Sequence, residues 1–179
     1  MLHRLLPALL VPLAIAAHAA PASDPLAVAL LTLEAGRHAQ GVQLLVPLAN
    51  SGNAFAQYRL GMLYFHGQGV GEDEKIAIYW WKKAAAQGNV ESMFQLGSAF
   101  LFGNQIAKFV PDPDREAAMW YFQAASAGHA EAQYHLGLLF LAGKGVQENR
   151  QESARWMQKA AAQGHAEAKR ALPKIETSR

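Results

Sequence analysis

Residues 52–70 read GNAFAQYRLGMLYFHGQGV, and residues 128–146 read GHAEAQYHLGLLFLAGKGV. Between them, residues 88–102 read GNVESMFQLGSAFLF and keep the same order of glycine, small residues and Leu-Gly. Each segment starts at one of four glycines spaced by 36, 40 and 36 residues: Gly52, Gly88, Gly128 and Gly164. A period of this length predicts a solenoid built from repeated supersecondary units.

Several residue types return at matching positions of each period. They are the pairs Leu60-Gly61, Leu96-Gly97 and Leu136-Gly137, the aromatics Tyr64, Phe100 and Phe140, the tryptophans Trp80, Trp120 and Trp156, and the alanine pairs at 84–85, 124–125 and 160–161. This pattern resembles the Sel1-like repeat, a relative of the tetratricopeptide repeat, over residues 52–163. The resemblance implies an all-α fold, an α-solenoid of stacked antiparallel helix pairs.

The register divides the chain into a leader, a cap, three repeats and a tail. The repeats are expected at residues 52–87, 88–127 and 128–163, the second with a loop insertion. Because solenoids need atypical end units, we expect a divergent helical pair at 25–34 and 38–49, within residues 20–51. Residues 164–179 are expected to form a capping helix and tail. Pro173 stands at the repeat position that holds glycine in the other units, and we expect it to end the repeat.

Residues 1–19 are typical of a secretory signal peptide. His3 and Arg4 form a short basic start, an apolar run covers 5–17, and Ala17-His18-Ala19 is a small-x-small cleavage site. The run is shorter than the roughly 20 apolar residues that span a bilayer. We therefore expect cleavage after Ala19 and export to a bacterial periplasm, with an uncleaved membrane anchor as the alternative.

Local signals support helix pairs. Residues 54–65 carry apolar side chains at helical spacing, and Gly67 and Gly69 are suited to the turn that follows. Asp73 and Asn149 are expected to cap the second helix of their units, and Asp112 precedes a proline at the first helical position.

Glycines inside the first helix of each unit need compensation, since glycine costs about 1 kcal/mol there relative to alanine. These residues are Gly61, Gly97 and Gly137. We expect close approach of the second helix, with the repeated tryptophans filling the space between pairs. On that basis Trp120→Ala would cost about 3–5 kcal/mol and largely unfold the protein.

Composition excludes several function classes. With 51% apolar and 17% charged residues, the chain can bury a core. Its 16 basic and 14 acidic residues give +2, or +1 once the leader's Arg4 is removed, which argues against nucleic acid as a partner. The absence of cysteine excludes disulfides, a thiolate nucleophile and lipid attachment through cysteine, so no stable membrane insertion is expected after cleavage.

Residues that differ between the repeats mark surface that stacking leaves free. In the first helix of each unit they recur at i, i+4, i+7 and i+11, which places them in one stripe along the helix. They are Phe55, Arg59, Met62 and His66; Glu91, Gln95, Ser98 and Phe102; and Glu131, His135, Leu138 and Ala142. Because this helix lines the concave face of tetratricopeptide solenoids, the resemblance implies a groove here for a protein or peptide partner. An ordinary solvated helix face is the alternative.

The insertion in the second repeat is another candidate contact. Gln105 and Ile106 stand in the columns of Gly69 and Val70, and four extra residues follow. Ile106 and Phe109 would be poorly placed in a purely structural connector, so we include them among the partner-binding candidates. Alternatively, these side chains fold back over the edge of the stack.

Catalysis has little support. Of the five histidines after the leader, His129 and His165 replace Asn53 and Asn89, which favours a role at a helix start. The remaining three are His38, His66 and His135. No His-Glu-x-x-His spacing occurs, and Ser98 lacks the flanking glycines of a nucleophile elbow. We expect no catalytic residue, metal or cofactor.

The resemblance therefore favours an exported adaptor or scaffold that binds a protein or peptide partner. One alternative is a periplasmic immunity protein that occludes a toxin. Another is a β-lactamase-like hydrolase, as suggested for cysteine-rich relatives, but this chain lacks their paired cysteines.

Overall fold

A computed structural model describes residues 24–103 and 105–177, so the expected leader at residues 1–19 lies outside the described residues. The described part folds into nine α-helices and one 3-10 helix, with no strand. They are α1 (Pro25–Glu34), α2 (His38–Asn50), α3 (Ala54–Phe65), α4 (Glu74–Ala85), α5 (Val90–Phe102), η1 (Ile106–Lys108), α6 (Pro113–Ser126), α7 (Ala130–Ala142), α8 (Arg150–Ala162) and α9 (Ala166–Thr177). The prediction of an all-α solenoid is confirmed.

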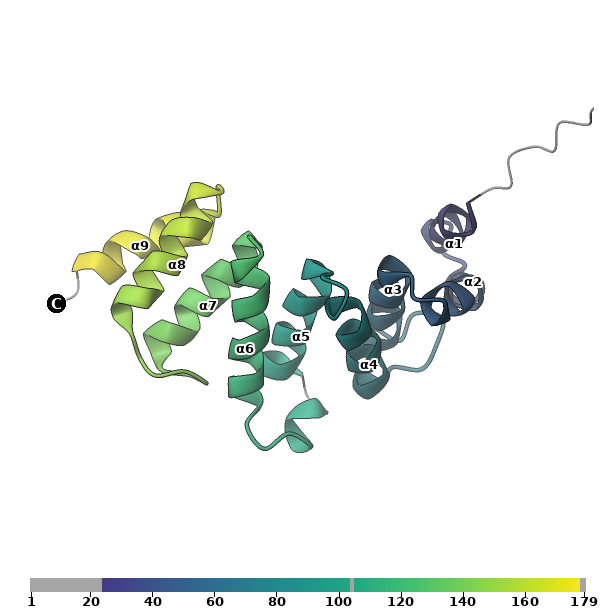
Figure 1. The fold of residues 1–179 in the computed structure, drawn as a ribbon, viewed down its shortest axis with the longest axis horizontal. Helices are drawn as coiled ribbons and strands as arrows, with labels where there is room; N and C mark the ends of the chain where they lie inside the picture. The colour runs from purple at the N-terminus through teal and green to yellow at the C-terminus, as the bar shows by residue number, and fades with distance from the viewer. Residues whose placement is uncertain (1–23, 104, 178–179) are drawn as a thin grey trace, which may run out of the picture.

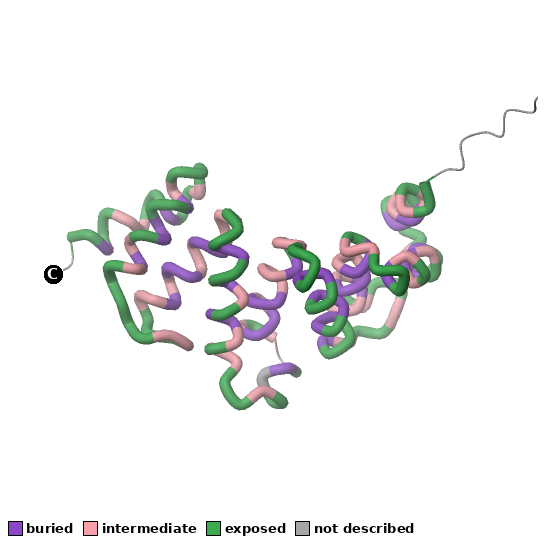
Figure 2. Tube along the Cα trace, viewed as in Figure 1, coloured by how far each residue is buried: buried purple, intermediate pink, exposed green. Residues whose placement is uncertain are grey.

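The helices stack in chain order, and each packs mainly against the helices before and after it (Figure 1). Both ends of the stack bend toward the same side, and η1 lies on the opposite side, below the middle. Buried residues follow the sides of the helices that face their neighbours (Figure 2). None of the helices between residues 24 and 177 is long and apolar enough to cross a membrane.

Side-chain caps start the second helix of each repeat, as predicted for Asp73 and Asn149. Asp73 Oδ1 accepts from the N–H of Lys75 and of Ile76, both at 2.9 Å. Asp112 and Asn149 cap α6 and α8 in the same way. Each such bond satisfies a backbone donor that the first helical turn leaves unpaired.

The glycines inside α3, α5 and α7 make room for one side chain of the paired helix. A Cβ added at Gly61 would lie 2.3 Å from Trp81 Nε1, and one at Gly97 would lie 2.7 Å from Tyr121 Cδ1. At Gly137 the nearest atom is Met157 Cγ, at 3.0 Å. The expected close approach of the second helix to the first is confirmed. In each pair a large side chain of the second helix packs directly against the glycine.

The tryptophan prediction needs correction at its central member. Trp80 and Trp156 are buried, but Trp120 is only half-buried. The next position along the helix, held by Tyr121 in α6, is fully buried. Successive residues of a helix point about 100° apart. The residue after the repeated tryptophan therefore faces the glycine of its own helix pair, whereas the tryptophan itself faces the neighbouring pair. Trp120 is therefore not the side chain on which the middle repeat depends most.

The ends of the described part follow the prediction in one case and depart from it in the other. Helices form at 25–34 and 38–50, where the divergent pair was expected. Pro173, however, lies inside α9, which continues to Thr177. Proline removes one hydrogen bond of the helix but does not break it here.

Candidate functional site

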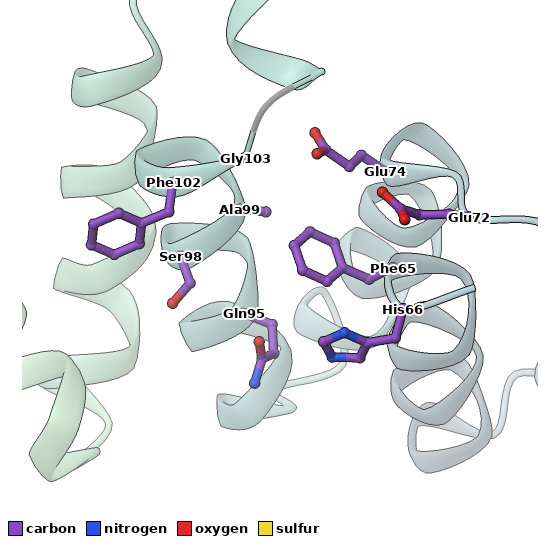
Figure 3. Close-up of a pocket in the computed structure, with 9 residues that line it drawn as sticks. All are labelled: Phe65, His66, Glu72, Glu74, Gln95, Ser98, Ala99, Phe102 and Gly103. Atoms are coloured by element: carbon purple, nitrogen blue, oxygen red, sulfur yellow. The ribbon is translucent and has the colours of Figure 1, made fainter. Parts of the chain in front are cut away.

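The predicted partner-binding residues lie in several environments. His66, Gln95, Ser98 and Phe102 line one cleft, of about 480 Å³, between the α3–α4 pair and α5. The cleft also includes Phe65, Glu72, Glu74, Ala99 and Gly103. Phe65 points from the end of α3 toward α5, with Glu72 and Glu74 on one side of its ring and His66 on the other (Figure 3). The structure thus joins part of the predicted stripe to residues that the sequence analysis did not select.

The turn after α3 fixes two walls of the cleft. His66 ends the helix, and Gly67 follows in the left-handed region at φ +63°. A Cβ at Gly67 would lie 3.3 Å from Glu72 Cβ, so the turn places the backbone of Gly67 close to that of Glu72. The Asp73 N–H then donates to the Tyr64 carbonyl oxygen at 2.8 Å. Glu72 and Glu74 are thereby held at the rim formed by the start of α4.

Glu74 connects the cleft to the insertion of the second repeat. It is only 4% exposed, and its Oε2 accepts from the N–H of Gln105 at 2.9 Å and of Ile106 at 2.8 Å. These bonds hold the start of η1 beside α4. An acidic residue in the first turn of a helix is ordinary in sequence, so nothing marked Glu74 as the residue that positions a segment 31 positions away.

The inclusion of Ile106 among the exposed candidates is wrong. Its side chain is only 7% exposed and joins the core shared by α4 to α8, because Glu74 turns η1 back onto the stack. Phe109 is 63% exposed, and the Lys75 Nζ lies 3.7 Å from its ring centroid. Within the insertion, Phe109 therefore remains accessible and Ile106 does not.

His135 belongs to a packed aromatic cluster. Its ring stacks on Tyr121 with centroids 5.1 Å apart, and Phe102 meets it edge-on at 6.1 Å. Burial lowers the pKa of His135, against the opposing effect of Glu131, whose Oε1 lies 3.3 Å from Nε2. Burial also raises the pKa of Tyr121 to about 12, and its hydroxyl lies 3.0 Å from Ser98 Oγ. This part of the stripe holds α5, α6 and α7 together.

The histidines at helix starts have the predicted capping role. Nδ1 of His129 accepts from the Ala132 N–H at 3.1 Å, and Nδ1 of His165 accepts from the Ala168 N–H at 3.2 Å. On the other side of its ring, His165 Nε2 lies 2.9 Å from Glu131 Oε2. Each ring thus also ties its helix to the preceding repeat. No group of three or more His, Cys, Asp or Glu in the described part is arranged to bind a metal ion.

The remaining stripe residues do not extend the cleft as one open groove. Phe55 is exposed beside Tyr58. Met62 and Leu138 are half-buried and pack on core clusters. Arg59 is also half-buried, and its Nε has no hydrogen-bond partner among the residues that the structure describes.

Comparison with known proteins places these features in a wider group. The Sel1 repeat family model matches residues 54–89, 90–129 and 130–165, each two residues later than the division based on glycines. A solved Sel1 repeat protein from Oxalobacter formigenes matches with a TM-score of 0.73 and 32% identity, over 82% of this chain and 58% of that one. A protective antigen of uropathogenic Escherichia coli with an SLR fold matches with a TM-score of 0.66 and 35% identity, over 75% of this chain and 28% of that one.

A curated relative is a component of an ERAD-associated E3 ubiquitin-protein ligase, HRD3A, from Arabidopsis thaliana. It is 35% identical over 69 residues, which are 38% of this chain and 10% of the relative. The chain therefore spans only a small part of that relative and less than two thirds of both solved structures.

Proposed function

The chain belongs to the Sel1 repeat family, and on that premise we propose that it is a non-catalytic interaction module that holds a protein or peptide partner in the cleft between α3, α4 and α5. One observation carries the proposal. Four residues that vary between the repeats, from two different helix pairs, line the same cleft: His66, Gln95, Ser98 and Phe102. The Leu-Gly positions that recur in each repeat, by contrast, are buried.

The cleft is suited to side chains of an extended or helical segment. Its volume of about 480 Å³ is enough for two or three side chains, and its lining combines aromatic rings with polar acceptors. Phe102 is 64% exposed, so a partner could cover it and gain apolar contact without unfolding any part of the stack. A binding role follows from this geometry more directly than a reaction does.

We also propose that the partner is met outside the cytoplasm. The support is the sequence of residues 1–19, which has a basic start, an apolar run and a small-x-small site. N-terminal sequencing of the protein recovered from the periplasm of its host should give Ala20 as the first residue. Recovery of the intact chain from the membrane fraction would instead support an anchor.

The proposal is tested by a pull-down from periplasmic extract with paired variants. His66→Ala combined with Phe102→Ala should lose the partner, because both side chains line the cleft and are exposed. Phe122→Ala is the matched control, an aromatic on α6 that is 51% exposed outside this cleft. The proposal fails if the double variant keeps the partner, or if the control loses it equally.

A further inference from the structure

Glu72 lines the cleft with a charge that no other residue of the described part pairs. Its side chain is exposed and makes no hydrogen bond or ion pair with another described residue. Glu74, two residues further on, also lines the cleft, and no lysine or arginine does. A chain with a formal net charge of +2 thus has a cleft lined by two glutamates and one histidine, without a lysine or arginine.

The surrounding backbone holds the main chain of Glu72 and the carboxylate of Glu74 in place. The tight turn at Gly67 packs against the backbone and Cβ of Glu72, and the N–H groups of Gln105 and Ile106, at the start of η1, fix the Glu74 carboxylate. Gly103 supports the same arrangement, since a Cβ there would lie 3.0 Å from Glu74 Oε2. A ligand therefore meets a fixed Glu74 carboxylate and a Glu72 side chain that leaves a fixed backbone position, which reduces the entropic cost of binding.

An aromatic ring lies directly beside these carboxylates. Phe65 projects into the cleft between Glu72 and His66 (Figure 3). Its orientation is held by Trp81, with ring centroids 5.3 Å apart, and by an edge contact with His66 at 5.2 Å. Aromatic faces attract cations, and they also pack against the methylene stems of long basic side chains.

From this juxtaposition we propose that the cleft receives an arginine or lysine side chain of the partner, whose charged end pairs with Glu72 while its stem lies on Phe65. The inference rests on the proposed function and gives the chemistry of the partner. An acidic segment would be repelled by Glu72 and Glu74. A purely apolar segment would remove the water that hydrates the Glu72 carboxylate and offer no hydrogen bond in its place, which is unfavourable for a charged group.

The chain provides a matched control for Glu72 in its third repeat. Glu148 follows Gly143, which has the same φ of +63° as Gly67, and a Cβ at Gly143 would also lie 3.3 Å from the glutamate Cβ. Glu148 is exposed and does not line the cleft. Glu72→Gln and Glu148→Gln therefore remove the same charge from the same kind of turn, but only the first removes it from the cleft.

The test is an NMR titration of the full protein with three short peptides, identical except for a central arginine, citrulline or glutamate. At about 10 mM arginine peptide, above the millimolar Kd expected for one anchored side chain, the amides around Glu72 and Phe65 should shift. We expect binding to weaken about ten-fold with citrulline and about ten-fold in Glu72→Gln, because each change removes a charge-assisted hydrogen bond. Glu148→Gln should bind as the unmodified protein does.

Three results would overturn the inference: no shift with the arginine peptide, equal binding of the citrulline or glutamate peptide, or equal loss in the two glutamine variants. Repeating the periplasmic pull-down with Glu72→Gln separates this inference from the proposed function. If that variant keeps the partner while His66→Ala with Phe102→Ala loses it, the cleft is the binding site but the cationic anchor is wrong.

Discussion

Tyr121 shows how a single residue joins two repeats. Its ring lies over Gly97 of the paired helix, its hydroxyl meets Ser98, and its other contacts include the stacked ring of His135 in the next repeat. Trp120, the neighbour that the sequence pattern marks more clearly, is half-buried and leaves its Nε1 without a partner among the described residues. A repeated residue type thus identifies the helix but not always its most important side chain.

We expect Tyr121→Ala to lower the free energy of unfolding by about 3–5 kcal/mol, the usual cost of removing a large buried aromatic. Trp120→Ala should cost less, because that side chain is partly solvated in the native state. Tyr121→Phe, which removes only the contact with Ser98, should cost about 1 kcal/mol. Urea unfolding of the three variants gives these values, and a larger loss for Trp120→Ala would contradict the packing described.

His135 should make stability depend on pH. Burial lowers its pKa in the folded protein below 6.5, so in acid the unfolded chain binds this proton more readily than the folded one. Its contribution to stability is therefore complete above about pH 6.5 and is lost as the pH falls through the lowered folded pKa. Glu131 opposes this shift, and His165 and His129 reinforce it.

The variant His135→Gln tests this effect, since Gln95 occupies the same column of the second repeat. Urea unfolding at about pH 7.5 and pH 5 brackets the ordinary histidine pKa. The unmodified protein should lose more stability than the variant between these two values. An equal loss would show that other groups cause the acid sensitivity.

At the scale of the helix, glycine sets the distance between the two members of a pair. The atoms above Gly61 belong to the rigid Trp81 indole, which also donates to the Tyr58 carbonyl oxygen at 3.2 Å. Of the three atoms nearest a Cβ at Gly137, two belong to the flexible Met157 side chain, and the third is the Ser153 carbonyl oxygen at 3.2 Å. Helices of the same sequence pattern should therefore respond differently to an added methyl group.

Gly61→Ala should destabilise the protein, because overpacking costs about 1–3 kcal/mol and exceeds the gain in helix propensity of about 1 kcal/mol. Gly137→Ala should cost less than Gly61→Ala, because methionine adapts its shape to a new neighbour and the Ser153 carbonyl oxygen, 3.2 Å from the added Cβ, is the one close backbone atom among the nearest three. Thermal unfolding of the two variants measures the difference. A larger effect at Gly137 would mean that the α7–α8 pair is less adaptable than its side chains indicate.

Glu74 holds the insertion of the second repeat in place through two hydrogen bonds. Glu74→Ala removes the acceptor for two backbone donors, so the Ile106 amide should exchange its hydrogen faster while the rest of the stack is unchanged. Glu72→Gln is the control, because Glu72 does not bond to η1. Unchanged exchange at Ile106 in Glu74→Ala would show that core contacts of Ile106 alone hold the segment.

At the scale of the whole molecule, periodicity predicts the fold well because each helix pair repeats the same local contacts. The repeat pattern predicted three features that the structure shows. They are the turns at the four glycines spaced by 36, 40 and 36 residues, the caps at Asp73 and Asn149, and the helix at 54–65. The residues of the cleft could be predicted from the sequence only in part. Its α5 residues and His66 vary between repeats and were selected on that ground. Glu72 lies in a turn that recurs at Glu148, so variation between repeats did not single it out, whereas Glu74 bonds to an insertion that occurs in one repeat. A contact with such an insertion has no signature in a periodic sequence.

The most direct measurement is a photo-crosslinking comparison in living cells of the host. A photoreactive amino acid at Gln95, inside the cleft, should give one discrete adduct with a protein partner. The same amino acid at Gln151, an exposed position on α8 away from the cleft, should give none. Adducts of equal yield at both positions, or an adduct at Gln151 alone, would contradict the assignment of this cleft as the partner-binding site.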